Sequence, residues 1–567
     1  MLRRWGPMLV AVALAAAGCS KDEQPKEDEQ PAAEAPAAAA PQVKTIEEVE
    51  PNERTDQAMP VTEACVVEAS LEAAAGEDKR ASDWYRIAPA GTKMVRLAVS
   101  GVAGEDLQLN FLDADKNRLF RVDAGGVGEG EVYANLILDR EAYMRVYGSK
   151  GGKGGAYELK VQMQDPQAGH EVEPNDRYSM ASALAVGDRV EGYLTHPADE
   201  DWYRLALGDL PTGSVLRIDL TAVEGVRFGL EVVGTEEQVP IMKASSPEQG
   251  KGVVIRNLGV PGTPEAVYLV VKSAWVPGPK PKKYIQTHNA DATYALSVSS
   301  EAGGDDLERE PNDKPEEAIT LLDGQKIRGY LGAPDDVDWY RIEVERPSIL
   351  SAELSALDRV DLQLYVVDPE KKDQRRDFEL VRINDGKVAE PETLTNCALK
   401  PGDNYLRVEG AWKNVDGKWV RDFVNLDETY ELTVNLRTDE GKEEREPNDE
   451  LEKATGIAPG QTLRGTLHPK RDVDFFRLDL SDQNGPRQTV IECTGIPKVD
   501  VAITLLGPER DEKGKPKVVA SSSRGKGEAK EEIAKELLPG EYHILVRGQP
   551  RSESNARDQY VLTVTQP

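Results

Sequence analysis

The chain contains few of the residues from which most enzyme active sites are built. Its 567 residues include only five histidines and four cysteines, and aromatic residues make up 6%. Neither a His-Glu-x-x-His nor a Gly-x-Ser-x-Gly pattern occurs, so a zinc peptidase or a serine hydrolase of these types is not indicated. Because histidine is the side chain most often used as a general base, this composition favours a protein without catalytic activity.

Positive charge is also scarce. Lysine and arginine together number 70, against 101 aspartates and glutamates, which gives a formal net charge of −31. Nucleic acid and bare anionic lipid would repel such a chain, so we expect no nucleic-acid partner. The excess of carboxylates serves either solubility or the binding of cations.

The chain has no long apolar run, and its short one lies near the N-terminus. Met8 to Ala17 spans about half of the ~20 residues that a membrane-crossing helix needs. Small residues then precede Cys19, a pattern that resembles a bacterial lipobox. The resemblance implies a signal peptide over residues 1–18, cleavage before Cys19 and acylation (palmitate) of that cysteine. An ordinary secretory signal is the alternative. We therefore expect a lipid-anchored protein of the cell envelope, at the outer membrane, on its periplasmic or surface face.

Residues 19–44 are rich in proline, alanine and glutamate and have almost no large apolar side chains. A segment of this composition cannot bury enough surface to fold. We predict a disordered stalk with a reach of roughly 25–30 Å. Beyond the stalk, the remaining cysteines are Cys65, Cys397 and Cys493, which lie at non-equivalent positions of the repeated segments. A disulfide framework would recur with the repeat, so we expect buried free thiols. One disulfide between two of them is the alternative.

One motif, Glu-x-Glu-Pro-Asn, recurs four times and sets the organisation of the remaining chain. Its copies lie at Glu48–Asn52, Glu171–Asn175, Glu308–Asn312 and Glu444–Asn448. The spacing of roughly 120–140 residues is too long for a solenoid unit and suits a small domain. The predicted modules are residues 45–164 (module 1, the divergent one), 165–301 (module 2), 302–439 (module 3) and 440–567 (module 4).

Each copy continues with the same series of short alternating segments. Asp338 to Ile342 reads Asp-Trp-Tyr-Arg-Ile, and the copy closes on Tyr-x-Leu-x-Val at Tyr430 to Val434. Period-2 strands separated by Gly, Pro and Asp turns predict two antiparallel sheets packed over one core. We therefore predict an all-β fold of four tandem antiparallel β-sandwich modules, with at most one or two helical turns after each motif.

These segments together resemble the bacterial pre-peptidase C-terminal domain family and are similar to the collagen-binding domains of clostridial collagenases. The shared elements are Glu-Pro-Asn-Asp, Gly-x-Leu, Asp-x-Asp-Trp/Phe, Pro-Gly-x-Tyr and the closing Tyr-x-Leu-x-Val. The resemblance covers nearly all of the chain beyond residue 45 and is weaker in module 1, where Glu53 and Ala81 replace aspartates. It implies jelly-roll-like, non-catalytic sandwiches of a kind usually attached to secreted proteases.

Oxygen ligands gather in two segments of each later module. Residues two apart in an extended strand point the same way, so Glu171, Glu173 and Asn175 share a face, and Asp199 and Asp201 repeat this spacing. Ca²⁺ prefers six to eight oxygen ligands, and in some collagenase relatives these segments meet around calcium. We predict a Ca²⁺ site in each of modules 2 to 4, and a weak one or none in module 1. The alternative is that Asn and Asp cap a helical turn while the glutamates are solvated.

The predicted ligands have the same positions in all three modules. They are Glu171, Glu173, Asn175, Asp176, Asp199 and Asp201 in module 2; Glu308, Glu310, Asn312, Asp313, Asp336 and Asp338 in module 3; and Glu444, Glu446, Asn448, Asp449, Asp472 and Asp474 in module 4. His196 and His468 precede prolines near these segments, and we interpret them as turn residues.

Modules 2 and 3 carry insertions before their last strand. These insertions contain aromatic residues that could contact a partner: Trp275, Tyr284, Trp412, Trp419 and Phe423. Folding back onto the sheet edge or the next module is the alternative. The sequence as a whole predicts a non-enzymatic envelope lipoprotein that serves adhesion or binds protein or polysaccharide. A structural scaffold of an envelope complex is the second possibility, and a hydrolase is the third.

Overall fold

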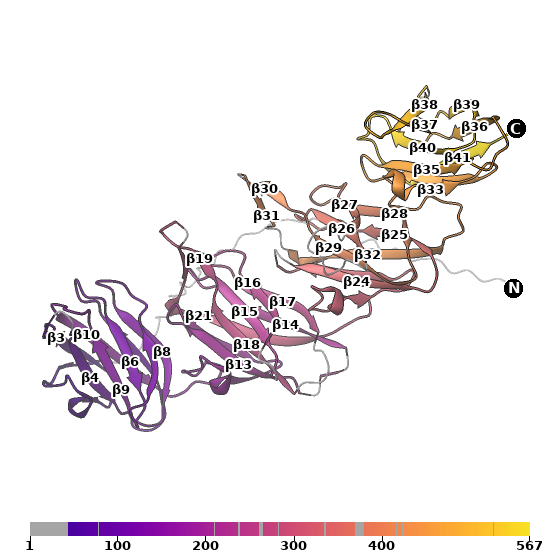
Figure 1. The fold of residues 1–567 in the computed structure, drawn as a ribbon. Coiled ribbons are helices and arrows are strands. Elements are labelled where there is room, and N and C mark those ends of the chain that lie inside the picture. The colour runs from indigo at the N-terminus through magenta and orange to yellow at the C-terminus, as the bar shows by residue number, and fades with distance from the viewer. Residues whose placement is uncertain are drawn as a thin grey trace, which may run out of the picture. The chain divides into compact units, whose positions relative to one another are not determined.

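Residues 43–567 of the computed structural model are described, except for 77–78, 209, 212, 236–238, 260–264, 282, 334–335, 369–378, 416, 422–424 and 525–526. This part of the chain is all-β, and its helical elements are four 3-10 turns (Figure 1). Repeats 1 to 4 are used below as names for residues 45–164, 165–301, 302–439 and 440–567.

Repeat 1 contains two five-stranded sheets. Their strand orders are β1-β3-β10-β5-β8 and β2-β4-β9-β6-β7. The elements are β1 (Lys44–Glu47), η1 (Thr55–Gln57), β2 (Met59–Val61), β3 (Cys65–Leu71), β4 (Ser82–Ile87), β5 (Lys93–Val99), β6 (Gln108–Leu112), β7 (Arg118–Val122), β8 (Glu131–Leu138), β9 (Ala142–Tyr147) and β10 (Gly155–Gln164).

Repeat 2 keeps this order without a counterpart of β1 and adds a hairpin. Its sheets are β11-β13-β18-β15-β16, β12-β21-β14-β17 and the two-stranded β19-β20. The elements are η2 (Tyr178–Met180), β11 (Ser182–Ala185), β12 (Arg189–Leu194), β13 (Glu200–Ala206), β14 (Ser214–Leu220), β15 (Phe228–Val233), β16 (Pro240–Ser245), β17 (Val253–Gly259), β18 (Ala266–Ser273), β19 (Trp275–Pro277), β20 (Tyr284–Gln286) and β21 (Asn289–Ala302).

Repeat 3 has the same arrangement, with sheets β22-β24-β29-β26-β27 and β23-β32-β25-β28 and a hairpin β30-β31. The elements are η3 (Pro315–Glu317), β22 (Ile319–Thr320), β23 (Lys326–Leu331), β24 (Val337–Val344), β25 (Ser348–Leu354), β26 (Leu362–Val367), β27 (Glu379–Ile383), β28 (Glu392–Leu399), β29 (Gly402–Gly410), β30 (Lys413–Val415), β31 (Lys418–Val420) and β32 (Asn425–Thr438).

Repeat 4 forms sheets β33-β35-β40-β37-β38 and β34-β41-β36-β39. Its elements are η4 (Leu451–Lys453), β33 (Thr455–Ile457), β34 (Thr462–Leu467), β35 (Val473–Asp479), β36 (Arg487–Cys493), β37 (Val501–Arg510), β38 (Pro516–Ser522), β39 (Glu531–Leu537), β40 (Glu541–Gly548) and β41 (Asn555–Thr565).

The strands form because their apolar residues alternate with polar ones. In β13, Tyr203 and Leu205 are fully buried, whereas Arg204 between them is exposed. This period-2 burial places one apolar face of each strand against the interior. Each repeat accordingly has its own main cluster of buried apolar side chains. The cysteines Cys65, Cys397 and Cys493 are buried, and none of them forms a disulfide within the described part of the chain, as the sequence predicted.

The prediction of four separate antiparallel β-sandwich modules is wrong. Residues Thr45–Pro567 form one compact unit, and backbone pairing crosses every predicted boundary. Glu173 forms a parallel bridge with Leu136, Glu310 with Leu258, and Glu446 with Cys397. The sheets also contain parallel pairs, such as β11 with β13. Alternation in sequence predicts strands but does not show which strand a connecting segment will pair with.

The strands of the described residues are arranged as the stacked coils of a β-solenoid of about 19 turns. The residue-by-residue ladders are instead mostly antiparallel, as between β13 and β18 or β24 and β29. The ladders govern the geometry of the sites below, because they specify which residues lie opposite one another.

The helical turns after each motif are single 3-10 turns, which agrees with the short helix expected there. Their N-cap residues are Arg54, Arg177, Lys314 and Glu450, and none of these makes a side-chain capping hydrogen bond. The asparagines and aspartates of the motif are therefore not the caps. The asparagine side chains are buried beside the acidic clusters, whereas Asp313 and Asp449 are exposed.

Candidate metal centres

Three buried acidic clusters combine the Glu-x-Glu motif with an aspartate at the start of a strand. In repeat 2, one oxygen each from Glu171, Glu173 and Asp201 lie within 4.8 Å of one another, and all three residues are fully buried. The corresponding clusters are Glu308, Glu310 and Asp338 in repeat 3, and Glu444, Glu446 and Asp474 in repeat 4. The structure thus brings together the two segments that the sequence assigned to one site, while metal binding itself stays a prediction.

The first glutamate of each motif is held in place by hydrogen bonds. In repeat 2, Oε1 of Glu171 accepts the backbone N–H of Tyr193 at 2.7 Å and an amide hydrogen of Asn135 at 3.2 Å. Glu308 accepts the N–H of Tyr330 at 2.5 Å, and Glu444 accepts that of Thr466 at 2.7 Å. Hydrogen bonds to a charged acceptor are stronger than those between neutral groups, so they hold this carboxylate in place within the acidic cluster, which is called the cage below.

A pair of buried tyrosines supports the strand aspartate. The hydroxyls of Tyr203 and Tyr294 are 2.6 Å apart, and Tyr294 donates to Oδ2 of Asp201 at 2.6 Å. Tyr340 and Tyr430 repeat the pair in repeat 3, where Tyr430 donates to Asp338 at 2.5 Å. The tyrosine of the closing Tyr-x-Leu-x-Val is therefore a core residue that also orients a cluster carboxylate.

A glycine makes room for this arrangement. A Cβ atom at Gly192 would overlap the carboxylate of Glu171 and the hydroxyl of Tyr294. The same overlap, with the equivalent glutamate and tyrosine, would occur at Gly329 and Gly465. The glycine that opens the Gly-x-Leu segment is thus required by space rather than by backbone conformation.

Several buried oxygens of the clusters have no hydrogen-bond donor within the described part of the chain. In repeat 2 they are Glu173 Oε1, Asn175 Oδ1, Asp199 Oδ1 and Asp201 Oδ1; in repeat 3 they are Asn312 Oδ1 and Asp338 Oδ1. A buried acceptor without a partner costs about 1–3 kcal/mol, and more when it is charged. Carboxylate and amide oxygens in this number are the donor set of a hard cation such as Ca²⁺.

The amide of Asn448 in repeat 4 can turn either end toward the carboxylates. If its nitrogen faces the cluster, it can donate to Glu446 Oε1 at 3.3 Å and to Asp474 Oδ1 at 3.2 Å. A cation between the same groups would instead attract the amide oxygen. The side chain can serve either state because an amide offers a donor and an acceptor at opposite ends.

Burial and mutual repulsion raise the pKa values of the clustered carboxyl groups. Desolvation is the main cause throughout, and it raises the pKa of Glu171 to about 8 and that of Asp199 to about 6. Burial and neighbouring carboxylates hold the pKa of Glu173 and of Asp201 well above the usual range. Glu310, Asp336 and Asp338 of repeat 3, and Glu446, Asp472 and Asp474 of repeat 4, have pKa values well above normal for the same reasons. A bound cation would reverse the repulsion.

The first aspartate of each Asp-x-Asp segment (Asp199, Asp336 or Asp472) lies in the turn before the strand, called the acidic turn below, and has two roles. Oδ2 of Asp199 accepts the N–H of Thr195 at 2.5 Å and its hydroxyl at 2.9 Å, which closes the turn. Asp336 accepts the N–H of Gly332 at 2.5 Å, and Asp472 that of His468 at 2.7 Å. In Asp199 the other oxygen stays free for a cation. Asp313 and Asp449 accept backbone N–H groups of Val337 and Val473 at 3.3 and 3.4 Å, near the rim.

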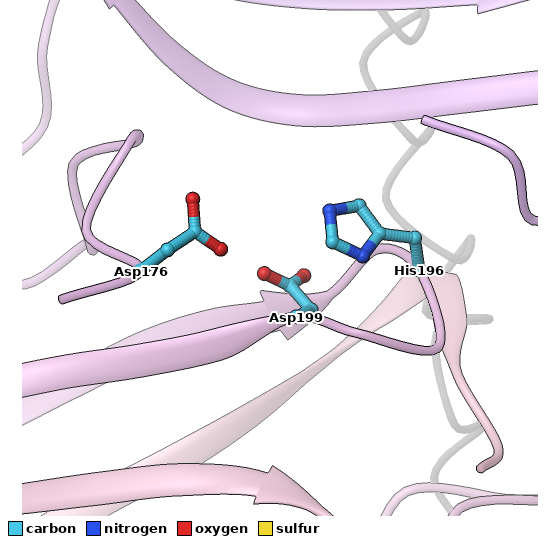
Figure 2. Close-up of side chains that lie close together, drawn as sticks. All are labelled: Asp176, His196 and Asp199. Carbon is cyan, nitrogen blue, oxygen red and sulfur yellow. The ribbon is translucent and has the colours of Figure 1, made fainter. Parts of the chain in front are cut away.

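Repeat 2 has a second group of ligands beside its main cluster. Asp176, His196 and Asp199 offer one ligand atom each within 4.8 Å, and Figure 2 shows their side chains turned toward one another. Burial lowers the pKa of His196 and raises the pKa of Asp176 to about 6. The sequence assigned His196 to a turn, where it does lie, and missed its approach to the aspartates. A histidine shortly before an acidic turn carries no periodic signal of such a contact.

Repeat 1 has a looser version of the cluster. Glu48, Glu50 and Asp83 lie within the same 4.8 Å, but Glu50 is exposed and Glu48 is half-buried. Tyr157 donates to Asp83 at 2.7 Å, and burial raises the pKa of Asp83 to about 8. The residue before Ser82 is Ala81, so the acidic turn has no first aspartate. Fewer buried oxygens surround this cluster than those of the later repeats.

The aromatic insertions form the two hairpins, and their aromatic side chains are exposed. The exposed fractions are 59% for Trp275, 60% for Tyr284, 51% for Trp412 and 66% for Trp419. Trp275 lies opposite Gln286, and Pro277 lies opposite Tyr284, so both aromatics share one face of the first hairpin. Arg421 stacks over Trp412 at 4.8 Å. Their exposure leaves these four side chains accessible to a partner, and partner binding itself stays a prediction.

Two predicted sites lie outside the described residues. These are Cys19, with its signal peptide and stalk, and Phe423. Among the described helices, none has the length and apolarity required to cross a membrane.

Comparisons with known proteins give little guidance. No family model and no curated protein matches the chain. The chain is similar to a solved structure, the pre-peptidase C-terminal domain of a collagenase from Bacillus anthracis, at 16% sequence identity over 21% of this chain and 100% of that one, with a TM-score of 0.17.

Proposed function

We propose that the protein is a non-enzymatic lipoprotein of the cell envelope whose repeats bind Ca²⁺ and whose hairpins bind a protein or polysaccharide ligand. The observation that carries the calcium part is the set of buried acceptor oxygens without donors, which occurs among carboxylates in repeats 2 and 3. In folded protein such oxygens are normally satisfied. A divalent cation would satisfy them and neutralise the clustered charge.

In this proposal the ligands divide by role. The first glutamate and the first aspartate of the acidic turn already accept hydrogen bonds and hold the cage in shape. The asparagine and the strand aspartate of repeats 2 and 3 present oxygens that have no donor, and in repeat 2 Glu173 and the second oxygen of Asp199 do so as well. The cation would supply charge compensation, and it would tie the opening segment of each repeat to its own sheet.

Calorimetric titration of the full chain with CaCl₂ tests the calcium part. We expect saturable binding that is lost when Asp201, Asp338 and Asp474 are all changed to Asn. Asp83→Asn, in the looser cluster of repeat 1, is the matched control and should leave most of the binding intact. Equal heats for the wild-type chain and for the triple variant would refute calcium binding at these clusters.

The hairpins support the binding part. Exposed aromatic side chains on a rigid scaffold suit contacts with protein or glycan. On the first hairpin they lie beside the exposed Lys280 and Lys283, in a chain whose net charge is −31. The local excess of positive charge favours an anionic ligand. A scaffold in which these residues pack between repeats would not leave them half to two-thirds exposed.

Surface plasmon resonance against immobilised acidic and neutral polysaccharides tests this part. Trp275→Ala with Tyr284→Ala, and Trp412→Ala with Trp419→Ala, should each weaken binding to an acidic polysaccharide by about tenfold or more. Leu538→Ala changes an equally exposed apolar residue outside the hairpins and should have no effect. Equal binding by all four proteins would exclude the hairpins as the contact.

A further inference from the structure

Consecutive repeats meet at an asparagine whose backbone has a left-handed conformation. Asn135, Asn257 and Asn396 have φ values of 58°, 48° and 52°. Each lies in an edge strand of its sheet (β8, β17 or β28), at a bulge where the register shifts against the neighbouring strand. Asparagine is one of the few residues with a side chain that adopts this conformation readily. The three side chains are 2–6% exposed.

Each asparagine contacts the acidic cluster of the following repeat in two ways. Its amide donates to Oε1 of the first glutamate: Asn135 to Glu171 at 3.2 Å, Asn257 to Glu308 at 3.2 Å and Asn396 to Glu444 at 2.9 Å. The backbone carbonyl oxygen of the asparagine accepts the backbone N–H of the second glutamate at 3.0 Å in all three cases, for Glu173, Glu310 and Glu446. The residue two places after the asparagine then donates its N–H back to that glutamate's carbonyl oxygen at 2.7–2.9 Å.

Repeat 4 provides an internal comparison. The equivalent strand is β39, where Lys535 occupies the asparagine position. Its ladder with β36 runs through Arg487–Cys493 without a register shift, and Lys535 is not among the residues with positive φ. The bulge and the asparagine thus occur in the three repeats whose strand meets a following Glu-x-Glu-Pro-Asn segment, and not in the fourth.

A cavity between repeats 2 and 3 has walls from both. Its volume is ≈ 280 Å³, and it is lined on one side by Arg256 and Asn257 and on the other by Glu310, Asp313 and Asp336. At the boundary between repeats 1 and 2, Tyr133 of repeat 1 donates to Oε2 of Glu173 at 2.9 Å. Residues of the earlier repeat therefore face the cage of the later one.

We propose that the cation sites of repeats 2 to 4 are composite sites, each completed by the repeat before it. The earlier repeat supplies the asparagine that positions the two glutamates, and the later repeat supplies the cation ligands. This rests on the proposed Ca²⁺ binding and adds a consequence to it. Cation binding would join consecutive repeats, because the glutamates that it fixes are also the residues that pair with the earlier strand.

Hydrogen exchange of the full chain, measured by mass spectrometry over a CaCl₂ series against EGTA, tests the proposal. In the wild type, Ca²⁺ should slow exchange in peptides over residues 253–259 and 306–313, and equally at the boundary between repeats 3 and 4. Asn257→Gly keeps the left-handed backbone but removes the amide. It should raise the Ca²⁺ concentration for half-protection at the boundary of repeats 2 and 3 by about tenfold, the effect of one hydrogen bond to a charged group. The boundary of repeats 3 and 4 should be unchanged.

Two further variants sharpen this test. Asn257→Asp retains the backbone preference and places a carboxylate against Glu308, so it should weaken Ca²⁺ protection more than the glycine does. Lys535→Gly changes the equivalent position of repeat 4 and should leave all three boundaries as in the wild type. An unchanged half-protection concentration in both Asn257 variants would overturn the composite site while leaving calcium binding in place. Absence of Ca²⁺ protection in the wild type would overturn the calcium proposal itself.

Discussion

Repeats 1 and 3 hold the same motif in different surroundings. In repeat 3, Glu308 and Glu310 are buried, and Gly329 lies opposite Tyr430 in the ladder. In repeat 1, Ala69 lies opposite the equivalent Tyr157. The space that the methyl group of Ala69 occupies is the space into which repeat 3 fits a carboxylate. Glu308 is accordingly fully buried, whereas the equivalent Glu48 is only half-buried.

The comparison extends to the neighbours of the motif. Glu310 pairs with Leu258 of the preceding repeat, and no described strand stands in that relation to Glu50. Glu48 accepts the N–H of Ser70 at 2.9 Å, as Glu308 accepts that of Tyr330, but Glu308 also accepts an amide hydrogen from Asn257 of the preceding repeat. The acidic motif therefore acts as a buried cluster only where a glycine opens the sheet and an earlier strand covers the segment.

The largest expected effect is that of closing the glycine space in repeat 3. Gly329→Ala should destabilise the folded state by about 3 kcal/mol, since the new methyl group overlaps buried polar groups that cannot move apart. Hydrogen exchange in β23 should rise sharply. Gly456→Ala adds a methyl group at a strand position with nothing within 4 Å and should change stability by less than about 1 kcal/mol. Similar losses in the two variants would show that the space has no special role.

The next effect is the response to pH in the absence of divalent cations. A carboxyl group whose pKa is higher in the folded than in the unfolded protein stabilises the fold below its unfolded pKa, and that contribution is lost as pH rises through the folded pKa. For Glu171 this interval is from 4.5 to about 8, and for Asp176 and Asp199 it is from 3.8 to about 6. In EGTA, the Tm should therefore fall between pH 4 and 8.

Two experiments test whether the clustered carboxylates cause this pH response: addition of Ca²⁺ and replacement of one carboxylate by a neutral amide. Saturating Ca²⁺ should remove much of the fall, because it compensates the ionised carboxylates. Asp201→Asn removes one charge from the cluster and should flatten the curve in EGTA. Calorimetric Tm values at pH 4 to 8, with Ca²⁺ and with EGTA, provide the measurement. A Tm in EGTA that rises from pH 4 to 8 would contradict the expected direction of the pH response.

A smaller effect should separate the repeats in their response to Ca²⁺. A ligand that binds the folded state alone stabilises it by about 2.7 kcal/mol at a hundredfold excess over Kd. Asp338→Asn should abolish the stabilisation of repeat 3 by Ca²⁺. Asp83→Asn should hardly alter the stabilisation of the chain by Ca²⁺, because the repeat 1 cluster is partly solvated. Differential scanning calorimetry with and without Ca²⁺ measures both. An equal loss of Ca²⁺ stabilisation in the two variants would show that repeat 1 binds Ca²⁺ as repeat 3 does, which contradicts the prediction.

The smallest effects on stability should come from the hairpins. Trp275→Ala and Trp419→Ala remove side chains that are 59% and 66% exposed, so each should change stability by no more than about 0.5 kcal/mol. Circular dichroism melting curves check this. A large loss of stability would mean that these residues support the fold, and the binding role proposed for the hairpins would lose its basis.

Much of the local structure could be predicted from the sequence. The alternation in segments such as Asp338 to Ile342 indicated the strands and their buried faces, because one face of a pleated strand must be apolar to be buried. Residues two apart in the motif were expected on one side, and Glu171, Glu173 and Asn175 are all buried together. The expected capping role of the motif residues failed, since the turns begin after Arg54, Arg177, Lys314 and Glu450.

What the sequence by itself determined is thus the strands, the fourfold repetition and the two acidic segments, because each follows from periodicity or spacing along the chain. Only the tertiary structure decided that the repeats are not separate, that Asn257 reaches Glu308 across 51 residues, and that His196 meets Asp176 and Asp199. These contacts depend on hydrogen bonds between distant segments and on the space that a glycine leaves. Hydrogen bonds between distant segments and the space beside a glycine leave no periodic pattern in the sequence, so they could not be predicted from it.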